Sequence, residues 1–197
     1  MIRAPYVIRR LNWTFWAITT SLVPVRHNRI RDALYALSAL GGFAPDKERG
    51  GMHDDPSRPA DLFLPSYSVG KSAALDVTVV SPLIIENLHV AGELDVVSRA
   101  EDEKHVLYDP KCKALGWEFI PLAVDSYGHW GPEAHKCFAK IATRIAVRTK
   151  VSTSVALSSL YNTLGVVLAR QNARAILARS EHQLGAREVR QLASFRS

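Results

Sequence analysis

The spacing of hydrophobic residues changes several times along the chain, and each spacing predicts one kind of element. In residues 28–43, NRIRDALYALSALGGF, apolar positions recur every three or four residues before a Gly-Gly pair, which predicts a helix. The run DLFL (61–64) and the β-branched run AALDVTVV (73–80) predict two strands joined by the turn PSYSVGKS. WEFIPLAV (117–124) predicts a third strand.

The segments between these strands are polar or helical in pattern. Residues 44–57 form a Gly/Pro-rich connection, and residues 83–109 are mostly helical in pattern, although Gly92 and Pro110 argue against one continuous helix. From Ala134 onward the Ala-, Arg- and Leu-rich sequence predicts two or three helices. A leading helix, two strands, a helix and a strand predict a three-layer α/β fold.

Positive charge is concentrated at the end of the chain. The net charge is +6, yet residues 136–197 contain eleven Lys and Arg against two acids, and the preceding residues contain fourteen against seventeen. We therefore expect an N-terminal extension (1–25), an α/β core (26–135) and a basic helical C-terminal region. A basic region on a near-neutral body predicts a nucleic-acid partner, and a solvated helical face is the alternative.

Within that region, basic residues recur every fourth position and so fall on one side of a helix. These residues are Lys136, Lys140, Arg144 and Arg148. Basic side chains in such a row are expected to bind the backbone phosphates of DNA, and phosphate contacts do not read the base sequence.

Cysteine content and hydropathy indicate in which cellular compartment the protein is expected. Cys112 and Cys137 form neither a disulfide framework nor a metal-ligand spacing, so we expect a reducing nuclear or cytoplasmic environment. The N-terminal sequence MIRAPYVIRRLNWTFWAITTSLVPV has basic residues before an apolar stretch, which leaves a targeting segment open. That stretch is too short to cross a bilayer, so no membrane partner is expected.

Two aspartates lie within strand-like hydrophobic sequence. Asp61 begins the first run and Asp76 lies inside the second, where burial of a carboxylate is costly without compensation. Residues two apart in a strand share a face, so Asp76 and Thr78 point the same way, and the connecting turn should bring Asp61 near them. Paired carboxylates repel unless a cation lies between them, and Mg²⁺ prefers such ligands. We therefore predict a Mg²⁺ or Mn²⁺ site, with solvated carboxylates at a sheet rim as the alternative.

The order of residues around these acids is similar to a known family pattern. Arg58 and Pro59 precede Asp61, with one extra residue between, and fourteen residues separate Asp61 from Asp76. This pattern resembles the PD-(D/E)XK nuclease superfamily. More narrowly, it resembles the restriction-like endonuclease domain of site-specific non-LTR retrotransposons, which occurs beside reverse transcriptases.

The position of the basic residue fits the narrower resemblance. The superfamily places a lysine two positions after the second acid, where this chain has Thr78. In the retrotransposon branch the following helix supplies the lysine, commonly with a tyrosine one turn later, and EKHVLYD provides Lys104 and Tyr108. The branch usually has a zinc-binding Cys/His segment before the stretch that corresponds to His27 and Asn28. Because residues 1–26 contain no cysteine, His27 is interpreted as a loop histidine rather than a zinc ligand.

The resemblance implies a fold and an activity. The fold would be a three-layer restriction-endonuclease-like core of helix, mixed sheet with a β-hairpin, and helix. The activity would be metal-dependent hydrolysis of DNA phosphodiester bonds, with Asp61 and Asp76 holding the metal ion and Lys104 acting on the attacking water or the phosphate. The alternative is a catalytically degenerate nucleic-acid-binding module of the same fold, and the oligomeric state is left open.

Further residues receive roles from the same resemblance. Asp32 is expected to add an acid from the leading helix, and the alternative is a first-turn acid that the helix dipole stabilises. Tyr108 is expected to contact a phosphate or the lysine, or to pack in the core. Arg58 and Lys71 are expected to contact backbone phosphate, with solvation as the alternative for Lys71.

Overall fold

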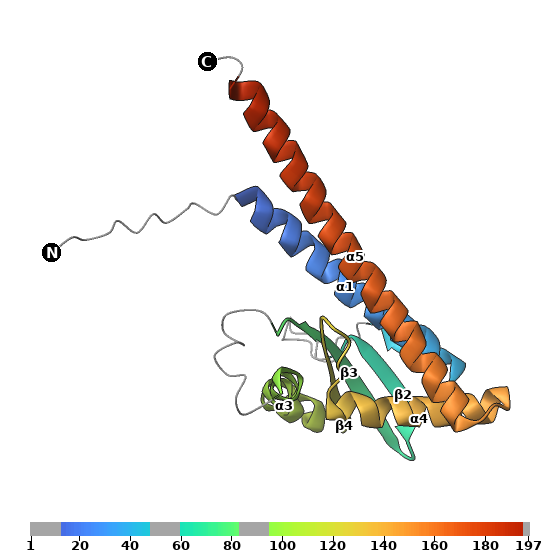
Figure 1. The fold of residues 1–197 in the computed structure, drawn as a ribbon. Coiled ribbons are helices and arrows are strands. Elements are labelled where there is room, and N and C mark those ends of the chain that lie inside the picture. Colours follow the sequence, from blue (N-terminus) through green and yellow to red (C-terminus); the bar gives the residue numbers. More distant parts are fainter. Residues whose placement is uncertain (1–12, 48–59, 83–94, 195–197) are drawn as a thin grey trace.

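A computed structural model describes residues 13–47, 60–82 and 95–194, which form a mixed α/β fold with four helices and a four-stranded mixed sheet (Figure 1). In chain order the elements are α1 (Trp13–Leu40), β1 (Asp46–Lys47), β2 (Leu62–Ser68), β3 (Lys71–Val80), α3 (Val96–Ala114), β4 (Trp117–Asp125), α4 (Pro132–Thr149) and α5 (Thr153–Ser194). The three predicted strands are all present, and β1 is a short addition from the segment expected to be a connection.

The sheet has the strand order β1-β2-β3-β4. β1 and β3 each pair with β2 in antiparallel orientation, whereas β4 pairs with β3 in parallel. A parallel pair needs a crossover, and α3 lies in the chain between the two strands. The same helix therefore connects β3 to β4 and packs against the sheet.

The hairpin turn is tighter than the sequence predicted. β2 continues through Pro65 to Ser68, so the predicted turn is wrong over these residues and the tip is Val69–Gly70. Gly70 adopts φ +69°, which a two-residue hairpin turn favours. The register shifts between Leu64 and Ser68, and such an irregularity accommodates a proline that cannot donate a ladder hydrogen bond.

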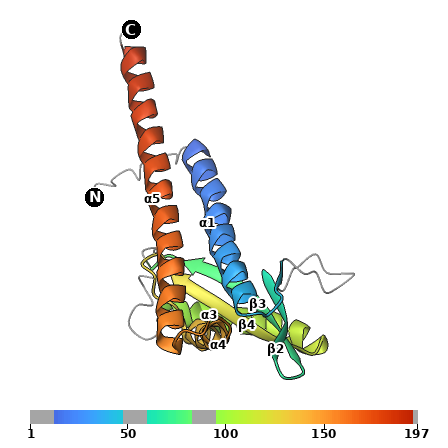
Figure 2. The ribbon, with the colours of Figure 1, turned by 90° about the vertical axis from the view of Figure 1, so that its right-hand side faces the viewer.

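Helices cover both faces of the sheet (Figures 1 and 2). Leu75 and Val77 of β3 belong to the main core with α1, α4 and the first part of α5. Ala74, which precedes Leu75 and so points to the opposite face, packs instead with Cys112 of α3 and Phe119 of β4. Asp76 shares the face of Ala74, opposite to Leu75 and Val77, as the alternation predicted, and the structure shows that this is the α3 side.

The two longest helices lie side by side and extend together beyond the sheet (Figures 1 and 2). α1 begins at Trp13, so residues 13–25 continue the helix that the sequence predicted from residue 28. The expected two or three C-terminal helices are two, α4 and α5, separated at Lys150 in a left-handed conformation. The expected boundary at residue 136 falls inside α4, whose buried face belongs to the main core.

Pro110 does not end α3, which runs without interruption to Ala114. A proline inside a helix removes the hydrogen bond to the carbonyl four residues earlier, here that of Val106. Val106 is exposed, so water reaches this side of the helix. The expected helical segment before residue 95, including Gly92, lies outside the described residues.

A buried glutamate connects α3 to the start of α4. Glu101 is 2% exposed and accepts hydrogen bonds from the backbone N–H groups of Glu133 (3.0 Å) and Ala134 (3.3 Å). These donors belong to the first turn of α4, where helical N–H groups lack intrahelical partners and favour negative charge. Burial raises the pKa of Glu101, and the backbone hydrogen bonds oppose that rise.

In the described part of the chain, no single helix has the length and apolar composition of a membrane span. Only α4 with the first part of α5 meets that test, as a pair bent by 119°.

Candidate active site at the β2–β3 hairpin

The hairpin places the two aspartates beside each other, as the sequence predicted. Asp61 lies just before β2, and its N–H donates to the carbonyl of Leu75 across the hairpin (2.9 Å). Its carboxylate Oδ2 accepts a hydrogen bond from the N–H of Val77 (2.7 Å). Asp61 is therefore hydrogen-bonded to the backbone of the residues on both sides of Asp76.

Asp76 is 7% exposed and is compensated by a lysine from α3. The Nζ of Lys104 lies 2.9 Å from Asp76 Oδ2, and the Thr78 hydroxyl donates to the same oxygen (3.1 Å). The structure therefore brings together Asp61, Asp76 and Lys104, the three residues that the resemblance placed in one site.

The pKa of Asp76 reflects this environment. Burial raises it, Lys104 acts in the opposite direction, and the nearby charge of Asp61 adds to the rise. Loss of the lysine would therefore leave a buried carboxylate facing a second one, which is costly.

His27 completes the site, and its interpretation as a loop histidine is wrong, because it lies within α1. Its Nε2 lies 2.8 Å from Asp61 Oδ2. The hydrogen bond to Asp61 raises the pKa of His27, burial opposes the rise, and the charges of Asp61 and Asp76 add to it. The missed signal is helical spacing: His27 lies three residues before the buried Ile30 and shares its face.

The His27–Asp61 pair predicts a pH-dependent stability. Because the folded-state pKa of His27 is raised above its ordinary 6.5, its contribution is fully present below pH 6.5 and is lost as the pH rises through the folded value. His27→Gln should therefore lower the melting temperature by about 2–4 °C at acidic pH and by less at alkaline pH. Thermal melts across the pH range check this, with Asp61→Asn as the control background, in which the pH-dependent difference should disappear.

The carboxylates keep oxygens that a metal ion could use. All hydrogen bonds and ion pairs described for Asp61 and Asp76 involve Oδ2, so the Oδ1 atom of each is left for another ligand. Two carboxylate oxygens suit Mg²⁺ or Mn²⁺, which retain several waters or take phosphate oxygens. The described residues contain no group of three or more His, Cys, Asp or Glu arranged to hold a metal ion. The donor set therefore fits a hydrated hard cation, and it does not provide an all-protein cage.

Tyr108 supports the lysine, whereas Asp32 has other partners. The Lys104 ammonium lies 5.2 Å from the centre of the Tyr108 ring, which packs against Phe119. This agrees with both expectations for Tyr108, contact with the lysine and packing in the core. The carboxylate of Asp32 pairs with Lys47 (2.9 Å) and with its neighbour Arg31 (3.2 Å), so its expected role as an additional acid stays a prediction.

The basic residues of α4 make structural contacts with the hairpin and the end of α1. The row consists of Lys136, Lys140, Arg144 and Arg148. Lys140 lies 3.6 Å from the centre of the Tyr67 ring and donates to Ser68. Arg144 donates to the Gly42 carbonyl (2.9 Å), and Arg148 donates to that of Leu40 (3.0 Å), as cations favoured at a helix C-terminus do. Three of the four side chains therefore hold α4 in place, and DNA contact by this row stays a prediction.

The other expected phosphate contacts are not tested by the structure. Lys136 pairs with Glu133 on the exposed side of α4 (2.6 Å), and Lys71 is exposed at the start of β3. Arg58 lies outside the described residues.

The site thus consists of two neighbouring carboxylates, each paired with one basic side chain. These pairs are Asp61 with His27 and Asp76 with Lys104, supplied by α1, the hairpin and α3. No family model, curated protein or solved structure was found to match this chain. The geometry of these four residues is therefore the basis for proposing a function.

Proposed function

We propose that the chain is a metal-dependent endonuclease domain that hydrolyses DNA phosphodiester bonds and has a retrotransposon origin. The observation that carries this proposal is the position of Lys104, whose ammonium lies 2.9 Å from Asp76, while Asp61 accepts a hydrogen bond from the residue that follows Asp76. A lysine next to two acids, one just before a hairpin strand and one within the adjacent strand, is the constellation that the restriction-like resemblance implies. Here it comes from α3, as in the retrotransposon branch.

The order of the elements also supports a restriction-endonuclease-like core. A leading helix, an antiparallel hairpin, a crossover helix and a parallel strand occur in this sequence order, and helices pack on both sides of the sheet. Fold alone does not establish an activity, so the proposed activity depends on the chemistry of the four site residues.

Each side chain has a chemical task in this proposal. Asp61 and Asp76 would hold Mg²⁺ or Mn²⁺ through their Oδ1 atoms. A bound ion of this kind polarises a phosphodiester and lowers the pKa of an attacking water. Lys104 would orient that water or stabilise the charge that develops on the phosphate. His27 would position Asp61 through the 2.8 Å hydrogen bond.

A second candidate is a catalytically degenerate DNA-binding module of the same fold. It is favoured by the ion pairs themselves, because His27 and Lys104 compensate both carboxylates without a metal ion. Thermal melts with millimolar MgCl₂ separate the two candidates. An endonuclease predicts metal-induced stabilisation that is lost in Asp76→Asn, whereas the degenerate module predicts no stabilisation in either chain.

Removal of Lys104 tests its catalytic role. Lys104→Ala should reduce magnesium-dependent nicking of supercoiled plasmid by about a hundredfold, because the group beside the reacting phosphate is lost. Lys113→Ala removes an exposed lysine from the same helix and should leave nicking unchanged. Full nicking by a folded Lys104→Ala chain would remove this lysine from the mechanism.

A further inference from the structure

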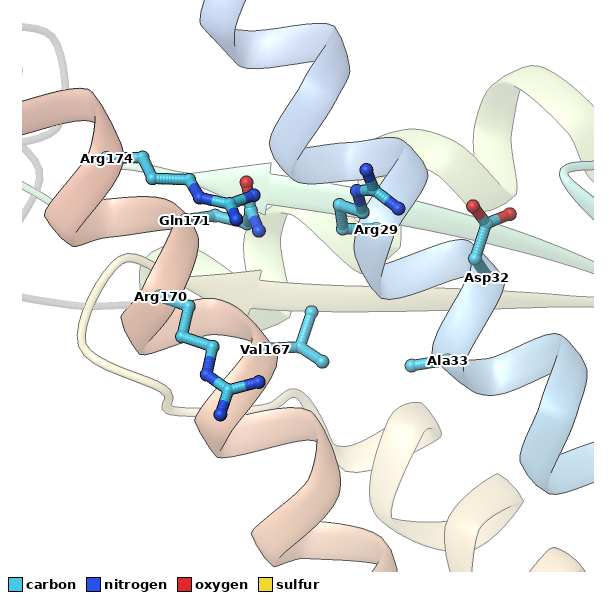
Figure 3. Close-up of a pocket in the computed structure, with 7 residues that line it drawn as sticks. All are labelled: Arg29, Asp32, Ala33, Val167, Arg170, Gln171 and Arg174. Carbon is cyan, nitrogen blue, oxygen red and sulfur yellow. The ribbon is translucent and has the colours of Figure 1, made fainter. Parts of the chain in front are cut away.

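A groove between α1 and α5 carries a second concentration of basic side chains, apart from the hairpin site. Its volume is about 450 Å³, and Figure 3 shows the seven residues that line it. They are Arg29, Asp32 and Ala33 on α1, and Val167, Arg170, Gln171 and Arg174 on α5. The groove is lined by three arginines and one acid.

The three arginines lack acidic partners within the described part of the chain. No ion pair or hydrogen bond involves Arg29, Arg170 or Arg174 there, and all three residues are exposed. The single acid of the groove, Asp32, is already compensated by Lys47 and Arg31. The groove therefore has a net positive charge available to a ligand.

Gln171 adds a neutral hydrogen-bond donor to the groove. The residue is 8% exposed and lines the groove, and among the described residues its amide is not one of the buried polar atoms that lack a partner. The amide therefore reaches the solvent of the groove. There it can donate to an anion that the arginines hold.

The arrangement suits a chain of phosphates. Guanidinium groups bind phosphate with paired hydrogen bonds. Arg170 and Arg174 lie one turn apart on one face of α5, separated by about 6 Å along the helix axis, and Arg29 faces them from α1. A row of donors along two helices fits an extended backbone better than a compact anion. We propose that this groove binds the sugar–phosphate backbone of a nucleic acid.

The groove would hold nucleic acid away from the scissile bond. Arg29 follows His27 by two helical positions, so the two side chains point about 200° apart around α1. The groove therefore lies on the other side of α1 from the carboxylates, and its arginines should affect affinity rather than the chemical step. The choice of nucleic acid as the polyanion rests on the proposed function.

The test is DNA affinity without catalysis. Fluorescence anisotropy with a labelled duplex in EDTA would compare the full chain with Arg170→Gln/Arg174→Gln. We expect affinity to fall about tenfold or more at low salt, and the slope of log affinity against log salt to fall by about two. Lys113→Gln/Lys150→Gln removes the same charge from exposed positions and should keep near-native affinity. Arg170→Lys/Arg174→Lys should recover part of the loss.

The outcomes separate this groove from the active site. Equal affinity in the groove double variant and the matched control would overturn the proposal, as would absence of duplex binding by the native chain. Competition by inorganic phosphate as strong as that by an oligonucleotide of equal phosphate concentration would also overturn it, because it would indicate a small-anion site. Native affinity of Asp76→Asn for DNA supports a binding groove that is independent of the active site. Continued nicking by Asp76→Asn would refute the proposed nuclease mechanism and would leave the groove proposal standing.

Discussion

Asp76→Asn is expected to reduce metal-dependent nicking of supercoiled plasmid by about a thousandfold or more. The change removes one of two carboxylates that would hold the ion, and with it the charge that the mechanism requires. The fold should be retained, because asparagine has nearly the same shape and can still accept from Thr78 and Lys104. Burial raises the pKa of Asp76, so a neutral side chain there should not lower the melting temperature.

The matched control is Asp102→Asn, the same chemical change at an exposed position of α3. It should nick plasmid at the native rate. Nicking that survives in Asp76→Asn, with a native melting curve, would show that the activity does not use this carboxylate. Equal loss in Asp102→Asn would point to a contaminating nuclease or to damage of α3.

The second large effect is on stability, at the contact between Glu101 and the start of α4. Glu101→Ala should cost about 3 kcal/mol of unfolding free energy, because it leaves buried N–H groups without an acceptor and removes packed atoms. Gly131→Ala should cost a similar amount. A Cβ at Gly131 would lie 2.2 Å from the Glu101 carboxylate and would displace it from its donors.

A double-mutant cycle distinguishes this mechanism from two independent defects. Gly131→Ala should be nearly neutral in the Glu101→Ala background, because the carboxylate that the new Cβ would meet is absent. Urea denaturation of the four chains measures the coupling. Additive losses would show that alanine at position 131 acts through the backbone rather than through Glu101.

Local patterns predicted the elements around the site. The β-branched residues of 73–80 predicted the strand. The alternation of residues along it predicted to which face of the sheet the carboxylate of Asp76 points. The position of Asp61 beside Asp76 was also predictable, because a short hairpin turn allows few registers between the two strands that it joins. Lys104 came from the family resemblance, since helical spacing alone does not show which residue faces a strand far away in the sequence.

The rest of the site depends on packing that no local pattern encodes. His27 reaches Asp61 because α1 crosses the sheet near the start of β2, a contact across 34 residues. The partners of Arg144 and Arg148 are backbone carbonyls near the end of α1, and a row of basic residues alone does not distinguish such acceptors from phosphate. The hairpin turn was misplaced because Pro65 suggests a turn, whereas at this irregular part of β2 the strand tolerates it.

The parallel pairing of β3 with β4 has a consequence for the order of folding. The hairpin closes over a short loop, so Asp61 and Asp76 meet early. By contrast, Lys104 is positioned when α3 packs on the face of β3 and β4, and His27 is positioned when α1 docks. Such non-local contacts carry a larger loop-closure cost and form later. A partly folded chain would therefore hold two uncompensated carboxylates and no positioned lysine, so the proposed hydrolytic activity would require the last steps of folding.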